Sequence, residues 1–350
     1  MTFYSRLCHA LAAGIPVLAL AACSGGGASG DSASGPPPEV ASIVLDVVPT
    51  GDTAGIYIAQ DDGYFARQGL TVKIVPVNGA QYGLGDLQTG TAQLIEGNYV
   101  SFILAQIAGR FAAPDPANAT ATEPSRPIDM RIIADTSQMQ PGNQALYVMP
   151  DAPYKTVQDL ARDHATVGVN ALHNVGTLLL GSLLVSNGHP VTAVRQVLET
   201  LPDLPRLLAE GKIAAAWLPE PLGTEAEQEY GATPLADFDQ GALQNFPIGT
   251  IAGTTSWVRS HPDTVAAFLR ALQQGQQVAD TNRAAVEQAL VKNGVVPSAL
   301  IAATMTLPSY PLAMDVPEMQ RVPDAMYEFG LIGRPYTITG MIQPEDGEVR

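Results

Sequence analysis

The chain has 350 residues, a formal net charge of −16 and 46% hydrophobic residues. This length is enough for two domains, and the hydrophobic fraction is ordinary for a globular protein. A strongly acidic chain without a basic stripe argues against nucleic acid as a partner. The negative charge also disfavours broad contact with anionic lipid headgroups, whereas acidity alone says nothing about a ligand.

The first 22 residues have the layout of a secretory signal peptide. Arg6 is the only Lys or Arg before residues 7–22, which contain no Asp, Glu, Lys or Arg. This run is shorter than the roughly 20 apolar residues of a transmembrane helix. It ends in Leu-Ala-Ala-Cys, which resembles the bacterial lipobox. We therefore predict cleavage after residue 22 and lipidation of Cys23, which would anchor the protein at the extracytoplasmic face of the cell membrane. A plain secreted protein is the alternative.

Residues 23–40 are rich in Gly, Ser and Pro and are predicted to form a flexible tether. As a Gly/Ser coil, residues 24–39 would span roughly 20–24 Å. The chain has two cysteines, and Cys8 leaves with the signal peptide. The body that follows Cys23 therefore has no thiol and no disulfide, so its stability must come from its core.

Strand-like and helix-like segments alternate after the tether. Strands are predicted at residues 41–48, 70–77, 93–95, 130–134, 145–149, 165–169, 213–218 and 250–258. Helices are predicted at residues 56–68, 86–91, 97–108, 177–186, 204–210, 264–280, 284–292 and 297–305, with a further helix starting at 157–160. Asp203 and residues 260–263 are the predicted caps of two of these helices. The alternation predicts α/β domains with mostly parallel sheets.

Motifs for catalysis are scarce. The sequence contains no Gly-x-Ser-x-Gly, no phosphate-binding loop ending in Gly-Lys-Ser/Thr and no His-Glu-x-x-His. The glycines at 83, 85 and 90 lack the spacing of the dinucleotide fingerprint. The four histidines after residue 23 are isolated from one another, so we predict no metal site and no cofactor. These observations favour a binding protein over an enzyme.

Small polar residues occupy three predicted junctions between a strand and a helix, at residues 50–55, 97–101 and 170–177. In open α/β sheets, ligands bind outside the carboxyl ends of the strands. Free N–H groups at helix N-termini there can bind an anion or a carbonyl oxygen. Ordinary N-capping explains each junction taken singly.

Residues 59–70, Ala-Gln-Asp-Asp-Gly-Tyr-Phe-Ala-Arg-Gln-Gly-Leu, resemble the signature Ala-x-x-x-Gly-Tyr/Phe-Phe-x-x-x-Gly-Leu of one family of ABC-transporter solute-binding proteins. This is the family that binds nitrate, sulfonates such as taurine, and pyrimidine precursors of thiamine. Further matches follow in order at residues 147–148, 157–160, 168–170, 176–179 and 208–221. The resemblance covers about residues 42–280.

The resemblance implies the α/β fold of type II periplasmic binding proteins, in which two lobes joined by two crossovers close on a ligand. Lobe one would comprise residues 41–144 and the return segment 241–350, and lobe two residues 145–240. The crossovers are expected near residues 144–147 and 239–250. The implied function is capture of a small polar organic solute, sulfonate-like or pyrimidine-like, by a monomer that delivers it to an ABC permease.

The resemblance also implies the residues of the ligand cleft. Carried over onto matching positions, they are Thr53, Asn98, Tyr99, Asn174, Thr177 and Glu220. Weaker candidates are Asp52, Tyr57, Gln81 and Trp217. Of these, Tyr99 and Trp217 could stack on a planar ligand, although Trp217 also suits the core of lobe two.

The sequence departs from the family pattern in ways that bear on the ligand. Gln93 stands where the family often has an aspartate, and the three junctions contain no Arg or Lys. A strongly charged anion would lie beside Glu220 without a cation, so a neutral, zwitterionic or amine-bearing solute is favoured over nitrate. Two alternatives to transport stay open. One is a ligand-sensing lipoprotein, and the other is a pyrimidine-precursor enzyme on the same fold, whose cysteine-rich motif is missing here.

Overall fold

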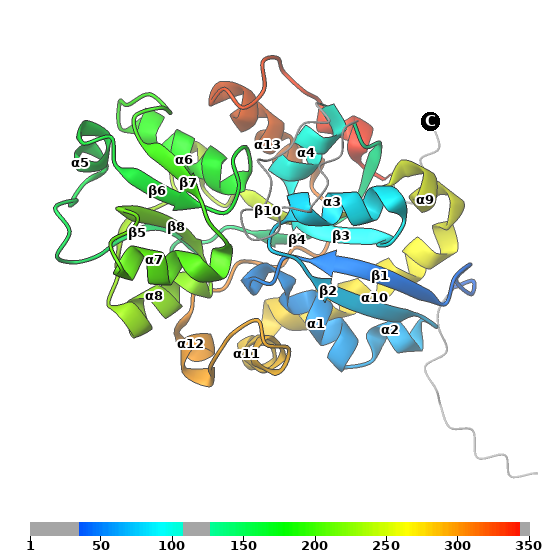
Figure 1. Cartoon of the computed structure of the whole chain (residues 1–350). Helices are drawn as coiled ribbons and strands as arrows, with labels where there is room; N and C mark the ends of the chain where they lie inside the picture. The colour runs from blue at the N-terminus through cyan, green and yellow to red at the C-terminus, as the bar shows by residue number, and fades with distance from the viewer. Residues whose placement is uncertain (1–34, 108–126, 344–350) are drawn as a thin grey trace, which may run out of the picture. The chain divides into compact units, whose positions relative to one another are not determined.

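The computed structural model describes residues 35–107 and 127–343. The predicted signal peptide, Cys23 and most of the predicted tether lie outside these residues. Within them, no helix is both long enough and apolar enough to cross a membrane. The described chain is built on two five-stranded sheets, both within one compact unit (Figure 1).

Sheet 1 contains the first strands of the body and a strand that returns much later in the chain. In spatial order it consists of β2 (Thr71–Pro76), β1 (Ser42–Val47), β3 (Leu94–Asn98), β10 (Pro247–Thr254) and β4 (Met130–Gln138). Strand β1 runs parallel to β2 and β3, whereas β10 runs antiparallel to β3 and β4.

Sheet 2 is built in the same mixed way. In spatial order it consists of β7 (Arg195–Leu198), β6 (Thr166–Val169), β8 (Ala215–Pro219), β5 (Gln144–Val148) and β9 (Thr233–Asp237). Strand β6 is parallel to β7 and β8, and β5 is antiparallel to β8 and β9. The α/β organisation matches the prediction, but the sheets are mixed rather than mostly parallel, because β10 and β5 each run against their neighbours.

The chain passes between the sheets at two places among the described residues. Strand β4 of sheet 1 is followed by β5 of sheet 2, so the first passage is at residues 139–143. Residues 144–147, the expected site of this crossover, are instead hydrogen-bonded within β5. The second passage, at residues 238–246, joins β9 to β10 and includes the 3₁₀ helix η3 (Gly241–Leu243).

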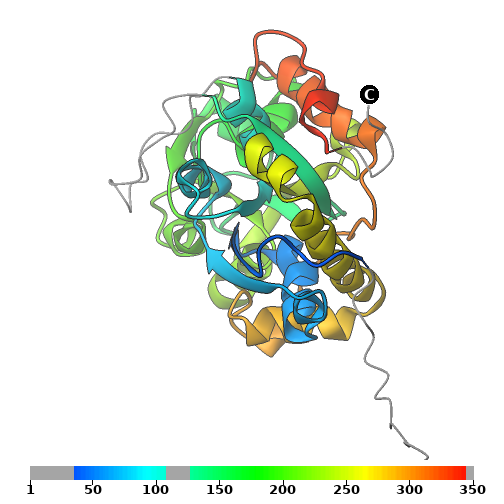
Figure 2. The same ribbon diagram turned by 90° about the vertical axis from the view of Figure 1, so that its right-hand side faces the viewer.

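Helices cover both faces of sheet 1. One core holds apolar side chains from α1, α2, α10, α11 and α12, and another holds those from α3, α4 and α13. Figures 1 and 2 show α10 running across the sheet on the side of α1 and α2. The bounds are α1 (Ala54–Asp61), α2 (Tyr64–Arg67), α3 (Ala80–Thr89), α4 (Tyr99–Ile107), α9 (Thr255–Ser260), α10 (Pro262–Thr281), α11 (Arg283–Lys292), α12 (Ala299–Thr304) and α13 (Val316–Glu328).

Four α-helices pack against sheet 2, and short 3₁₀ helices complete the described chain. In Figure 1, α5 and α6 lie on one side of the sheet and α7 and α8 on the other. The helices are α5 (Val157–Arg162), α6 (Val175–Ser186), α7 (Leu204–Ala209) and α8 (Leu222–Tyr230). The remaining 3₁₀ helices are η1 (Gly51–Thr53), η2 (Leu201–Asp203) and η4 (Ile338–Met341).

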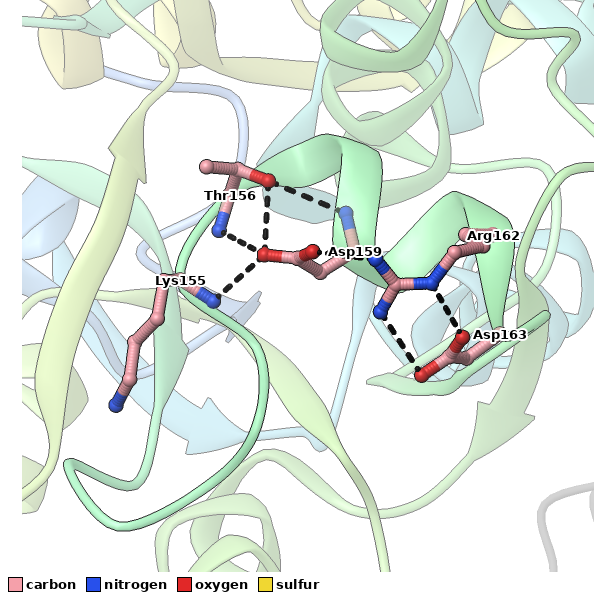
Figure 3. A network of polar contacts seen from close by, with 5 residues as sticks. All are labelled: Lys155, Thr156, Asp159, Arg162 and Asp163. Atoms are coloured by element: carbon pink, nitrogen blue, oxygen red, sulfur yellow. Dashed lines mark hydrogen bonds and ion pairs between the residues drawn. The ribbon is translucent and has the colours of Figure 1, made fainter.

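Helix α5 shows how local sequence sets a helix start (Figure 3). The Thr156 hydroxyl accepts a hydrogen bond from the Asp159 amide at 3.2 Å, and an Asp159 carboxylate oxygen accepts from the Thr156 amide at 3.0 Å. This reciprocal capping box satisfies N–H groups that a helix start leaves free. Arg162 pairs with Asp159 and Asp163 at 2.9 Å on the exposed surface.

Several predicted elements differ in extent from those observed. The predicted helix at 56–68 is divided at Gly63, whose φ of 72° lies in the left-handed region that favours glycine. The predicted strand at 250–258 ends at Thr254, because the Thr254 side chain accepts from the Trp257 amide and starts α9. The helix predicted at 86–91 begins earlier, at Ala80. Strands β7 and β9 and helix α13 were not predicted.

Candidate functional site

A cavity of about 40 Å³ lies between the two sheets, at the ends of strands from both. Its described lining comprises Val48, Thr50, Asp52, Gly79, Ala80, Glu96, Gly97, Asn98, Gln144, Asn170, Asn174, Val175, Leu201, Trp217, Pro219, Ile248 and Gly249. Because β1, β3, β6 and β8 all end here, the polar residues that follow these strands converge on one place.

The turn after β1 brings Thr50 and Asp52 to the cavity. The Thr50 hydroxyl donates to an Asp52 carboxylate oxygen at 2.9 Å and accepts from the Asp52 amide at 3.4 Å. This exchange starts η1 and fixes the Asp52 side chain. Asp52 is only 9% exposed.

Strand β3 contributes Glu96 and Asn98. One Glu96 carboxylate oxygen accepts from the Val48 amide at 3.0 Å, and the other accepts from the Thr136 hydroxyl at 3.5 Å. Glu96 is 2% exposed. The Asn98 side-chain oxygen accepts from the Ser101 amide at 2.9 Å, so Asn98 caps the start of α4.

The side of the cavity formed by sheet 2 is lined by amides and an indole. Asn174 caps α6 by accepting from the Thr177 amide at 3.3 Å, and its Nδ2 donates to Asn170 Oδ1 at 2.6 Å. The Trp217 indole N–H donates to the Gln144 side-chain oxygen at 3.1 Å. These bonds hold the four side chains in fixed orientations.

Direct hydrogen bonds join the two sides around the cavity. The Gly51 amide donates to the Glu220 carbonyl at 3.1 Å, and Asn170 Nδ2 donates to the Asn78 carbonyl at 3.4 Å. In this arrangement the cavity holds only a small group. A ligand large enough to need the usual 300–1,000 Å³ requires the two sides to separate.

The electrostatics of the cavity are dominated by the two carboxyls. Burial raises the pKa of Asp52, and hydrogen bonds from Ser137 and Thr50 only partly offset that rise. Burial also raises the pKa of Glu96 well above its ordinary value, and the charge of Asp52 raises it further. None of the described lining residues is Lys, Arg or His. The site therefore has no cation of its own to balance these groups.

Four of the residues predicted for the cleft line the cavity, namely Asp52, Asn98, Asn174 and Trp217. Trp217 is 3% exposed, so it is both part of the sheet 2 core and a wall of the cavity.

Six other predicted residues contribute no described surface to the cavity. Thr53, Tyr57 and Tyr99 are buried, and the Thr53 hydroxyl donates to the Thr50 carbonyl at 2.8 Å. Gln81 is 9% exposed, next to Gly79. The last two are Thr177 and Glu220.

Thr177 and Glu220 are held by the protein itself. The Thr177 hydroxyl donates to the Ala171 carbonyl and to the Gln196 side chain, both at 3.1 Å. The Glu220 carboxylate accepts from the Thr224 hydroxyl at 2.8 Å and from the Thr306 amide at 3.3 Å. Glu220 therefore links the start of α8 to the segment after α12.

Four polar lining residues were not singled out as ligand-binding from the sequence, namely Thr50, Glu96, Gln144 and Asn170. Thr50 and Asn170 lie inside the junctions that the sequence indicated, so the junction pattern contained a signal for them. Glu96 lies within a strand and Gln144 begins one. The sequence alone does not mark either as a cavity residue, because only the pairing of the strands brings them there.

Gln93, the departure from the family pattern, lies away from the cavity. Its side-chain oxygen accepts from the Val44 amide at 2.8 Å, and its Nε2 donates to the Gly90 carbonyl at 2.8 Å. The residue thus ties β1 to the turn before β3. Among the described residues, no group of three or more His, Cys, Asp or Glu could hold a metal ion.

Comparisons with solved structures define the class of the fold. The alkanesulfonate-binding protein SsuA from Xanthomonas axonopodis pv. citri, bound to MOPS, is 15% identical, with 87% of this chain and 99% of that chain covered and a TM-score of 0.69. A Candida albicans gene product, described as having the generic periplasmic binding protein fold, is 12% identical with a TM-score of 0.69 over 89% of this chain and 99% of its own. The fold is therefore the two-lobed α/β fold of periplasmic binding proteins.

A third solved structure is the periplasmic nitrate-binding protein NrtA from Synechocystis, which is 17% identical over 74% of this chain and 68% of its own, with a TM-score of 0.61. No curated protein matches the chain. The family model described as the NMT1-like family matches residues 36–293. The chain belongs to the NMT1-like family.

Proposed function

We propose that this protein is the extracytoplasmic solute-binding component of an ABC importer. The cavity between the two sheets, lined by side chains from both, is the observation that carries the proposal. A site at strand ends that combines apolar walls with several polar side chains suits the capture of one small polar solute. Family membership and the similarity of fold support the same role.

The fixed orientation of the lining side chains supports binding. Asn170, Asn174, Gln144 and Trp217 are held by hydrogen bonds to one another or to the backbone. Preorganised donors and acceptors increase affinity because less side-chain entropy is lost on binding. The solute is a small polar organic molecule, and sulfonate-like and pyrimidine-like compounds are the first candidates.

Delivery to a permease fits the predicted lipid anchor. Lipid on Cys23 would keep the binding protein close to its membrane partner, and this raises the local concentration without a new contact. The acidic body would stand off an anionic membrane surface.

A growth experiment tests the transport function. A strain lacking the gene is grown on a panel of single nitrogen, sulfur or carbon sources. We expect growth to fail on one small polar organic solute and to be restored by the wild-type gene. Unchanged growth and uptake across the panel would count against transport and favour a sensing role.

A further inference from the structure

The geometry points to a positively charged N–H donor, such as a primary ammonium group, as the part of the solute that lies between Asp52 and Glu96. This inference rests on the proposed solute-binding function and specifies the chemistry of the solute. It differs from the sulfonate and nitrate named for the structurally similar proteins, since those ligands are anions.

The first reason is the placement of the two carboxyls. Asp52 follows β1 and Glu96 lies in β3, the neighbouring strand, and both side chains line the same cavity. They are 9% and 2% exposed, so bulk water solvates neither well. A buried carboxylate is stable only when it is paired or protonated. With no described cation in the lining, the solute is the natural source of positive charge.

The second reason is that most other polar groups of the cavity are already satisfied. The amides of Asn170 and Asn174 bond to each other, and the Gln144 oxygen is taken by Trp217. The side-chain oxygens of Asn98 and Asn174 cap helices. Asp52 accepts from Thr50, and Glu96 accepts from Val48 and Thr136. An ionised carboxylate has about four acceptor sites, so both carboxyls keep capacity for a further, charge-assisted hydrogen bond from a solute.

The third reason is space. At about 40 Å³, the cavity has room for roughly three water-sized groups. Gly249 lines this space, and a Cβ at this position would lie 2.2 Å from the Thr136 hydroxyl oxygen and 3.4 Å from Glu96 Oε1. A compact ammonium head group fits such a space, and the rest of the solute would extend towards the amides of sheet 2.

The affinity for a cationic solute should depend on pH with a definite sign. A cation competes with protons for Asp52 and Glu96, so its affinity should increase as the pH rises through their elevated pKa values. The other titratable groups beside them are Tyr57, whose pKa is raised to about 12, and Tyr310, whose pKa is raised further. Both stay neutral between about pH 5 and pH 8. An anionic solute would show the opposite trend.

The test uses methylammonium chloride as the probe, with sodium methanesulfonate and sodium chloride at equal ionic strength as references. The melting temperature of the purified protein is measured against probe concentration at about pH 5 and about pH 8. We expect methylammonium alone to raise the melting temperature, with a larger effect at the higher pH. Asp52→Asn and Glu96→Gln should each weaken the apparent affinity about tenfold or more.

Asp135→Asn is the matched control. Asp135 is also a buried carboxyl of sheet 1, at 7% exposure, but it lines a different cavity beside α10. This variant should respond to methylammonium like the wild type, which separates loss of the site from a general effect of removing a buried charge.

Each other outcome has a defined meaning. If methylammonium acts no differently from sodium, or if the two cavity variants respond like the wild type, the inference is overturned. Stabilisation by methanesulfonate in place of methylammonium would also overturn it, while leaving solute binding intact. Failure of the proposed function is detected separately, by unchanged growth of the deletion strain.

Discussion

Buried carboxyls without a cationic partner recur in sheet 1 and in the turn that follows β1. Asp46, Asp52, Glu96 and Asp135 are all at most 9% exposed, and burial raises the pKa of each one. Such groups cost stability, and proteins commonly retain them where function needs them. Asp52 and Glu96 line the proposed solute site. Asp135 does not line that site, so replacing it measures only the free-energy cost of burying a carboxyl.

Asp135→Asn should stabilise the protein more at high pH than at low pH. Burial raises the pKa of Asp135 from 3.8 to about 7. Between these values the folded chain holds a proton that the unfolded chain has lost, so the carboxyl lowers stability as the pH rises towards 7, and the full penalty remains above it. We expect a gain of roughly 2–4 kcal/mol in the free energy of unfolding at about pH 8.

Denaturant titration at several pH values measures this effect. The gain should shrink as the pH falls through about 4 and vanish near about pH 3, where the carboxyl is protonated in both states. Asp151→Asn, at an exposed position, is the control and should show no comparable trend. A gain for Asp135→Asn that is equal at about pH 4 and pH 8 would contradict the explanation.

At the scale of elements, α10 is capped from a distant part of the sequence. The Glu39 carboxylate accepts from the amides of Asp263 and Thr264 at 2.9 and 2.7 Å and from the Thr264 hydroxyl at 2.6 Å. The end of the predicted tether is therefore fixed to the body. The capping acceptor is Glu39 and not a side chain of the predicted cap at residues 260–263. Local patterns cannot reveal a capping residue that lies over 220 positions away.

Glu39→Ala should destabilise the protein by about 1 kcal/mol at neutral pH, because the first amides of α10 lose their acceptor. Slight burial opposes ionisation of Glu39, but the hydrogen bonds from Thr264 and Asp263 outweigh it and lower the pKa from 4.5 to about 2. This contribution is therefore complete above about pH 4.5 and is lost as the pH falls towards 2.

Thermal unfolding as a function of pH checks this prediction. Glu229→Ala, on the exposed side of α8, removes an acidic residue without removing a cap and should have little effect. An equal loss for both variants, or a Glu39→Ala effect that persists at about pH 2, would argue against capping.

The sequence predicted the presence of helices and strands better than their first and last residues. The strand patterns located β1, β2 and β6, which are rich in β-branched residues, and β5, all of whose residues are buried. Strand β7 was missed because none of its four residues is fully buried and only one of them is β-branched. Mixed sheets could not be foreseen, since the direction of β10 depends on its pairing with β3 and β4 and not on its own residues.

At the scale of the molecule, the site is formed by residues that the two passages between the sheets bring together. Asp52, Asn98, Asn174 and Trp217 were predicted from family resemblance at or near the junction patterns, and these four residues line the cavity. It could not show that Glu96 faces the same cavity, because that depends on how the sheets meet. Glu220 directly follows β8, as expected for a cleft residue, but its carboxylate accepts hydrogen bonds from Thr224 and Thr306.

Native mass spectrometry of the purified protein, wild type against Asn174→Ala, tests solute binding in this cavity most directly. Asn174 both lines the cavity and caps α6, so Asn282→Ala, which removes a similar cap from α11, is the matched control. We predict one bound small molecule on the wild type and on Asn282→Ala, and its loss from Asn174→Ala. A ligand retained equally by all three proteins would contradict the assignment of the site.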